Sequence, residues 1–195
     1  MSAMTELRGI TWNHTRGVVP MVAAAQRFEE LHAGVRISWE TRSLQEFADQ
    51  SLTELSARYD LLVIDHPWAG FAATTGVLRA MEDVVSAEFL ADQAANSVGP
   101  SFESYRYDGR TWALPIDAAT PVASWRPDLL ERAGVAVPST WEQLLELARR
   151  GLVVMPGIAQ DTIMNFYMFC QLPGSDLFES KEIVVSDEIG IMALE

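Results

Sequence analysis

Cysteine is almost absent from this sequence, which contains one, Cys170, in 195 residues. A single cysteine excludes an intrachain disulfide and a cysteine-cluster metal site. Cys170 lies in an apolar run, residues 163–172. We therefore expect a buried and unreactive thiol, with a nucleophilic role as the weaker alternative.

Basic residues are also scarce, because 14 Lys and Arg stand against 27 Asp and Glu, for a formal net charge of −13. Binding to a phosphate backbone needs clustered basic side chains, so this balance argues against a nucleic-acid-binding protein. It likewise disfavours docking on an anionic membrane. We attribute the charge to solubility rather than to an acidic interaction surface.

Long apolar runs are missing as well, and no stretch approaches the roughly 20 apolar residues that a membrane-spanning helix needs. Residues 1–8 place no apolar segment after a basic start. The chain as given therefore predicts no secretory signal and a cytoplasmic location. Its 49% hydrophobic and 21% charged residues are typical of a soluble globular protein.

Motifs of several common protein classes are absent too. The sequence has no G-x-S-x-G, no G-x-x-x-x-G-K-[ST] and no G-x-G-x-x-G. Serine hydrolases, P-loop proteins and dinucleotide-binding proteins therefore lose their usual support. Asp65 and Asp117 are the one acidic pair that we place near a common cleft. They fit either the acid pair of a glycoside hydrolase or carboxylates that hold sugar hydroxyls.

The first 64 residues alternate between strand and helix patterns. Strands are predicted at 7–12, 35–39 and 60–64, and amphipathic helices at 16–31 and 44–55. This order predicts a βαβαβ unit with parallel strands and right-handed crossovers. Residues 71–106 are less periodic and give no firm assignment, although Ser86 is a possible N-cap of a short helix.

Particular residues mark the helix ends. Asn13 and Thr15 are both suitable N-caps for the first helix, and we expect Pro20 in its first turn, where the missing N–H costs little. Ser43 and Glu46 have the spacing of a capping box for the second helix.

A second α/β pattern is predicted after residue 145. Strands are expected at 152–155 and 182–185, a helix at 161–172, and a last helix capped by Ser186. That last helix has no stop signal before the final residue, Glu195. We interpret this as the sign of a truncated chain.

Polar and aromatic side chains cluster where the first three strands end. Ligands of open α/β sheets bind outside the carboxyl ends of the strands. Flat aromatic faces beside carboxylates, amides and imidazoles suit a sugar-like polyol. The candidate ligand-binding residues in these loops are Trp12, Asn13, His14, Arg42, Asp65, His66 and Trp68.

Each candidate also has a purely structural interpretation. Trp12 closes an apolar strand and fits the core, Asp65 can cap a helix, and Arg42 can pair with a surface carboxylate. His14 and His66 can be solvated loop residues. The two histidines and Asp65 match no strong local metal motif, so we predict no metal and no cofactor.

Residues 109–145 carry a family resemblance. Gly109 in a turn precedes Leu114-Pro115, a polar segment and Trp125. Asp128-Leu129-Leu130 and then Pro138-Ser139-Thr140-Trp141-Glu142-Gln143-Leu144 follow as two helix starts. This succession resembles the extracellular solute-binding proteins of ABC importers, in the carbohydrate-binding group that includes maltose-binding protein.

The resemblance implies a non-enzymatic, two-lobed α/β protein with the type II periplasmic-binding-protein fold, which closes by a hinge on a small polar ligand and delivers it to a membrane permease. It implies a first lobe at 1–113, a crossing segment at 114–121, and an incomplete second lobe at 122–195. Asp117 and Thr120 would face the cleft, whereas Trp141 would be a packing residue. The family is longer than this chain, secreted or surface-anchored, and taken to be monomeric at full length.

Two alternatives stay open at this point. One is a cytosolic α/β enzyme that uses Asp65 with His14 or His66 as acid and base, favoured by the missing signal sequence. The other is a truncated product without activity, whose apolar residues at 163–172 and 189–194 would lack partners and cause aggregation.

Overall fold

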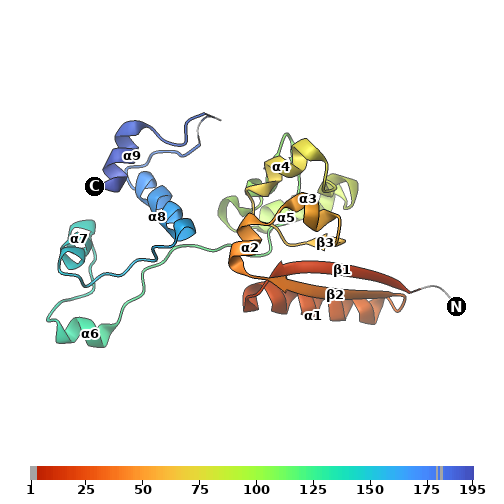
Figure 1. The fold of residues 1–195 in the computed structure, drawn as a ribbon, viewed down its shortest axis with the longest axis horizontal. Helices are drawn as coiled ribbons and strands as arrows, with labels where there is room; N and C mark the ends of the chain where they lie inside the picture. Colours follow the sequence, from red (N-terminus) through yellow and green to blue (C-terminus); the bar gives the residue numbers. More distant parts are fainter. Residues whose placement is uncertain (1–3, 179, 181) are drawn as a thin grey trace. The chain divides into compact units, whose positions relative to one another are not determined.

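The computed structural model describes residues 4–178, 180 and 182–195. The chain divides into two compact units, Met1–Val122 (unit 1) and Ala123–Glu195 (unit 2), whose elements are labelled in Figure 1. The strands of unit 1 are β1 (Thr5–Trp12), β2 (Val35–Arg42), β3 (Leu61–Leu62), β4 (Arg106–Tyr107) and β5 (Arg110–Thr111). Its α-helices are α1 (Thr15–Leu31), α2 (Leu44–Asp49), α3 (Leu52–Ser56), α4 (Trp68–Thr75) and α5 (Ala87–Asn96). Short 3₁₀ turns lie at Met81–Asp83, Gly99–Ser101 and Glu103–Tyr105.

A parallel sheet of order β2-β1-β3 forms the base of unit 1. This confirms the βαβαβ arrangement expected from the strand and helix patterns. Regular pairing of β3 is short, but two backbone bonds extend it on either side. Asp60 N donates to Arg8 O at 2.8 Å, and Val63 N donates to Ile10 O at 3.0 Å. The predicted strand at 60–64 therefore lies beside β1 over most of its length.

Helix α1 lies along β1 and β2 (Figure 1), and Thr11 Oγ1 of β1 donates to its Gly17 carbonyl at 3.2 Å. His14 is the N-cap, not Asn13 or Thr15 as expected. Pro20 consequently falls in the second turn instead of the first, so that prediction was wrong. Without an N–H, Pro20 cannot donate to the carbonyl four residues earlier, that of Arg16.

The single helix expected at 44–55 is two helices, α2 and α3, separated by an extended backbone at Gln50. The predicted capping box is confirmed at the start of α2. Ser43 Oγ accepts from Glu46 N at 3.2 Å, and Glu46 Oε2 accepts from Ser43 N at 2.7 Å. The break allows α3 to direct Leu52 and Leu55 inward, and both side chains are 1% exposed.

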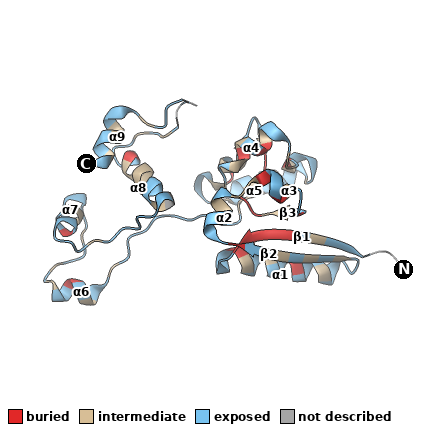
Figure 2. Ribbon diagram, viewed as in Figure 1, coloured by how far each residue is buried: buried red, intermediate tan, exposed pale blue. Residues whose placement is uncertain are grey.

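Two apolar clusters make the core of unit 1, and Figure 2 shows the second half of β1 as buried. One cluster joins Ile10, Leu55 and Tyr59 above the sheet. The other lies between β3, α4 and the chain leading out of β5, and consists of Leu52, Ile64, Ala69, Ala72, Ala80 and Trp112. Leu62 packs against both clusters, so the short strand β3 connects them.

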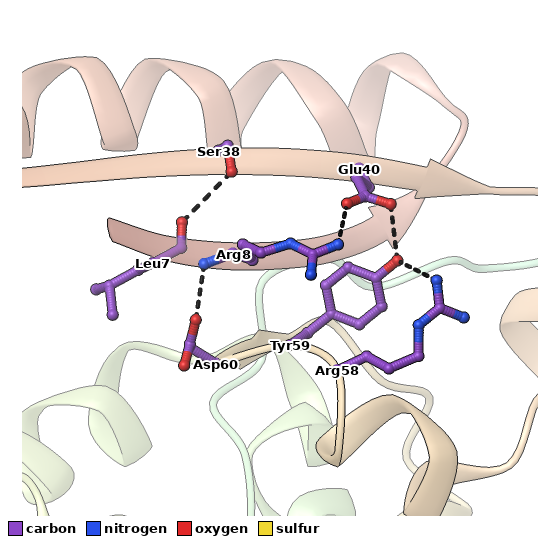
Figure 3. A network of polar contacts seen from close by, with 7 residues as sticks. All are labelled: Leu7, Arg8, Ser38, Glu40, Arg58, Tyr59 and Asp60. Carbon is purple, nitrogen blue, oxygen red and sulfur yellow. Dashed lines mark hydrogen bonds and ion pairs between the residues drawn. The ribbon is translucent and has the colours of Figure 1, made fainter. Parts of the chain in front are cut away.

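A polar network crosses the same sheet on the face opposite α1 (Figure 3). Arg8 Nη2 donates to Glu40 Oε1 at 2.6 Å, and the Tyr59 hydroxyl donates to Glu40 Oε2 at 2.8 Å. Arg8 N donates to Asp60 Oδ2 at 2.8 Å. The hydrogen bonds from Arg8 and then Tyr59 lower the pKa of Glu40.

This network joins the strands and lies away from their carboxyl ends. Arg8 stands four residues before the end of β1, a distance of about 13 Å along a strand. Exposed ion pairs add little to stability. The contribution of the network is therefore to hold β2 and the segment before β3 in register with β1.

A hairpin ends the compact part of unit 1 and leads into the predicted crossing segment. Strands β4 and β5 pair antiparallel through Arg106↔Thr111. The two turn residues, Asp108 and Gly109, have φ of 52° and 74°. Positive φ at both positions characterises the type I′ turn that suits a two-residue hairpin, which explains the glycine.

In unit 2 the described residues form helices only: α6 (Pro127–Arg132), α7 (Trp141–Arg149), α8 (Ala159–Gln171) and α9 (Asp187–Leu194). The expected cap is present at Ser186, whose side chain accepts a backbone N–H of α9, and Thr140 caps α7 in the same way. Residues 152–155 form no strand, and neither do the described parts of 182–185, so both strand predictions were wrong. A strand needs a ladder of backbone bonds to a partner, whereas, among the described residues, 182–185 accept only one from another segment, from Phe178 N to Val184 O at 2.8 Å.

Candidate ligand-binding site

The three parallel strands end side by side, and backbone and side-chain bonds tie their ends together. Asn13 N, just after β1, donates to Arg42 O at the end of β2 at 2.7 Å. Arg42 Nη2 in turn donates to Val63 O, just after β3, at 2.8 Å. We call residues 12–16, 42–43 and 63–68 the carboxyl edge.

Arg42 lies inside this edge instead of at its surface. It is 6% exposed, its guanidinium stands 5.0 Å from the ring centre of Phe47, and burial lowers its pKa. Nη1 also reaches Glu46 O at 3.4 Å, whereas Nε has no hydrogen-bond partner among the described residues. These contacts favour a scaffolding role for Arg42 over its expected ligand role, which stays a prediction, and place its guanidinium inside the edge instead of in a surface ion pair.

Trp12 is also a packing residue in this structure. Its side chain is 7% exposed and its ring lies 5.3 Å from that of Phe47. The ring also approaches α1 so closely that a Cβ on Gly17 would stand 2.6 Å from it. The core interpretation that the sequence left open therefore fits Trp12 better than a ligand contact.

His14 and Asn13 occupy the exposed start of α1. His14 Nδ1 accepts from Arg16 N at 3.1 Å and so caps the helix. This contact orients the imidazole and leaves Nε2 for a ligand. The Asn13 side chain is exposed. Both residues are accessible at the carboxyl edge, and their role as ligand contacts stays a prediction.

The loop after β3 carries three candidates in different settings. Asp65 is half-buried, and its Oδ1 accepts from His66 N at 2.9 Å, so it orders the loop rather than capping a helix. His66 is exposed. Trp68 begins α4, is half-buried, and meets Phe71 edge to face at 5.5 Å. Asp65 thus retains acceptor capacity at the edge, while Trp68 offers only part of its ring.

The predicted crossing segment reaches the carboxyl edge through Asp117. Its Oδ2 accepts from Arg16 Nη1 at 2.7 Å, a contact between residues 101 positions apart. The Asp117 side chain is 26% exposed and that of Arg16 is 49% exposed. Thr120, further along the segment, is exposed. The structure therefore brings Asp117 to the edge and adds Arg16, while the expectation that Asp117 and Thr120 face a ligand cleft stays a prediction.

Tyr105 is a second residue that sequence reasoning missed. Its hydroxyl donates to Ile64 O, two residues after β3, at 3.1 Å. Burial, followed by the negative charges of Asp65 and Asp117, raises its pKa to about 12. Both carboxylates therefore act on the same hydroxyl. Tyr105 lay in the weakly periodic stretch that gave no assignment, and only its place in the fold reveals it.

A shallow open depression adjoins Asp117. It has a volume of about 250 Å³ and is lined by Gln93, Asn96, Ser97, Val98, Ser101, Pro115, Ile116, Asp117 and Ala118. The polar atoms in this lining are amides, hydroxyls and one carboxylate. Within the described residues, no group of three metal-type ligands forms. The edge and the depression are therefore suited to hydrogen-bonding a polar organic ligand.

A family comparison decides the class of protein. Residues 11–158 match the model of the bacterial extracellular solute-binding proteins, which is well over half of the chain. The chain belongs to this family. Among the described helices, none combines the length and hydropathy that a membrane crossing requires.

Curated relatives agree with this assignment. The mannitol-binding protein of Pseudomonas aeruginosa is 28% identical over 139 residues, which cover 68% of this chain and 31% of that protein. The chain thus spans about a third of the length of this relative. The reported relatives are binding proteins, and the alternative of an enzyme gains no support from them.

Solved structures share the fold. A substrate-binding protein from Listeria monocytogenes, in complex with cycloalternan, superposes with a TM-score of 0.69 at 16% identity, covering 98% of this chain and 51% of that one. One from Agrobacterium vitis S4, with bound D-mannitol, has a TM-score of 0.54 at 22% identity and covers 74% and 35%. These likenesses confirm the α/β class and the type II periplasmic-binding-protein fold.

Proposed function

We propose that this chain is part of the solute-binding component of an ABC importer, and that it binds a sugar or sugar alcohol at the carboxyl edge of unit 1. The observation that carries the proposal is the meeting of Asp65, Tyr105 and the Arg16–Asp117 pair beside the strand ends. The relatives that bind mannitol and cycloalternan support the ligand class.

Each remaining candidate has a role in this proposal. The carboxylates of Asp65 and Asp117 accept hydrogen bonds from ligand hydroxyls, which are stronger than bonds between neutral groups. Asn13, His14 and His66 supply further donors and acceptors, and Thr120 supplies a hydroxyl. The exposed part of Trp68 offers an apolar face for a sugar ring. Trp12 and Arg42 support the edge from within.

The wider role also belongs to the proposal. We take the ligand to pass to a membrane permease, the protein to act outside the cytoplasm or at the cell surface, and its complete form to be a monomer. Residues 114–121 as a hinge segment, between lobes at 1–113 and 122–195, stay a prediction. The family description as extracellular solute-binding proteins supports the location.

Calorimetric titration tests the binding. We expect D-mannitol, mannobiose, maltose or cycloalternan to bind the folded chain, and Asp65→Asn to weaken that binding about tenfold or more, because a charged acceptor is lost. The matched control is Asp60→Asn, which changes a carboxylate at the other end of the same strand, bonded to Arg8 N. A chain that is folded by circular dichroism yet binds none of these ligands would overturn the proposal.

A further inference from the structure

Arg16 is the accessible cation of the carboxyl edge, and its charge is already engaged. The other guanidinium of the edge, that of Arg42, is buried and donates to Val63 O. Arg16 is half-exposed, and its Nη1 lies 2.7 Å from Asp117 Oδ2. An anionic ligand would find no unpaired cation among these two side chains.

Asp117 also belongs to the wall of the 250 Å³ depression. No Arg or Lys side chain lines that depression, so its hydrogen-bonding groups other than Asp117 are uncharged. Gln93 is half-buried in this wall, where its amide can both donate and accept. A ligand with hydroxyl groups meets suitable partners here, whereas a carboxylate or phosphate meets the charge of Asp117.

We propose that Asp117 sets the charge selectivity of this site. By holding Arg16, it makes the depression accept neutral polyhydroxy ligands and reject those that carry a carboxylate or phosphate. Removal of its charge turns Arg16 into an anion-binding group. This inference rests on the proposed function, since it names the ligand class of the same edge.

The charges around the edge also favour neutral ligands over anions. The guanidinium of Arg16 balances one of the two carboxylates, Asp65 and Asp117, and leaves the other unbalanced. Tyr105 adds no charge near neutral pH, and its hydroxyl hydrogen is committed to Ile64 O. A like charge within about 4 Å in a partly solvated setting lowers affinity about fivefold or more. Anions are therefore disfavoured in two ways: one carboxylate is unbalanced, and both guanidinium groups of the edge, Arg16 and Arg42, are already engaged.

Inorganic phosphate is a direct probe, because it needs no knowledge of the natural ligand. Titration of phosphate into the chain should show little binding to the wild type and a gain of about tenfold or more in Asp117→Asn, in which Arg16 is released. The gain should disappear in the double variant Arg16→Gln/Asp117→Asn. Asp117→Ser serves as a second variant if Asp117→Asn does not fold by circular dichroism.

The matched control lies on the same helix. Glu30→Gln releases Arg27 from an exposed pair of the same 2.7 Å length. Glu30, unlike Asp117, does not line the depression, and Arg27 lies outside the carboxyl edge. We expect no gain in phosphate binding from this change. An equal gain would show that any released arginine suffices and would overturn the proposal.

The remaining outcomes separate the two proposals. The selectivity proposal is overturned if the wild type binds phosphate as tightly as Asp117→Asn does. It is also overturned if the gain in phosphate affinity persists in the double variant that lacks Arg16. D-Mannitol titrated in parallel should bind Asp117→Asn more weakly than the wild type, because a charged acceptor is lost, while phosphate affinity rises. A wild-type chain that binds no neutral sugar or polyol overturns the proposed function, and with it the selectivity, even where Asp117→Asn gains phosphate.

Discussion

The two units of this chain differ in how they are held together. Unit 1 has a parallel sheet whose strands pair across long stretches of sequence, and two apolar clusters that share Leu62. In unit 2 the described elements are helices, and the described buried apolar side chains are Leu130, Leu147 and Cys170. Figure 2 shows the same contrast, since buried segments concentrate in unit 1.

This contrast explains why the candidate site is built in unit 1. Ligand residues must be held by elements whose own positions are fixed by packing and hydrogen bonds. The carboxyl edge meets this condition, because Arg42, Tyr105 and Asn13 N tie the strand ends together. Unit 2 exposes large apolar side chains such as Val154 and Leu194, and two of its helices, α6 and α8, have no side-chain cap.

The largest effect on stability should come from truncating a buried leucine to alanine in each unit. Leu55→Ala removes a side chain that is 1% exposed and should lower the free energy of unfolding by about 2–5 kcal/mol. Leu147→Ala in α7 should cost less, because fewer buried groups surround it. Urea unfolding followed by circular dichroism measures both. Equal losses would contradict the comparison between the units.

A smaller loss is expected from crowding the start of α1. Gly17→Ala would place a Cβ 2.6 Å from the Trp12 ring, and that ring is confined by Phe47. Overpacking outweighs the better helix propensity of alanine, and we expect a net loss of about 1–2 kcal/mol. Gly34→Ala is the control, since its Cβ would meet nothing within 4 Å. A neutral Gly17→Ala would show that the edge of unit 1 is less rigid than we infer.

Tyr105 should make the stability of unit 1 depend on alkaline pH. Its pKa is about 12 in the folded chain and about 10 when unfolded, so the folded state holds the proton more tightly. Its contribution is complete below pH 10 and is lost as pH rises from about 10 to about 12. Tyr105→Phe should cost about 1 kcal/mol at pH 8, where the bond to Ile64 O is lost.

The difference between wild type and Tyr105→Phe should then shrink toward pH 12. Thermal unfolding at a series of pH values measures it, with Tyr107→Phe as the control, since Tyr107 is an exposed residue of β4. A difference that stays constant with pH would contradict the burial of the Tyr105 hydroxyl.

The smallest effect concerns the reactivity of Cys170. This sole cysteine is 0% exposed in α8, so a thiol reagent should modify it more slowly in the native chain than in the denatured one. Leu147→Ala should raise the rate at which Cys170 is modified in the native chain, because unit 2 then opens more often. Leu55→Ala should raise this rate by a smaller factor. Mass spectrometry of the labelled chain measures these rates. A larger increase in the native modification rate for Leu55→Ala than for Leu147→Ala would show that the units do not open separately.

Much of the fold could be predicted from local sequence signals. The capping box at Ser43 and Glu46, the caps at Ser86, Thr140 and Ser186, and the strand-helix alternation are each encoded within a few neighbouring residues. The expected strands at 152–155 and 182–185 fail for the complementary reason, because a strand depends on a partner that local sequence does not specify.

The composition of the sequence by itself argued against nucleic-acid binding, and its order of motifs indicated the family and the edge on which to look for a ligand. Only the tertiary structure decided which candidates are accessible at that edge. It placed Trp12 and Arg42 inside, and it brought Arg16 to Asp117 and Tyr105 to Ile64. The physical reason is distance along the chain, since caps and periodicity act within a turn or two, whereas these contacts join residues 41 to 101 positions apart.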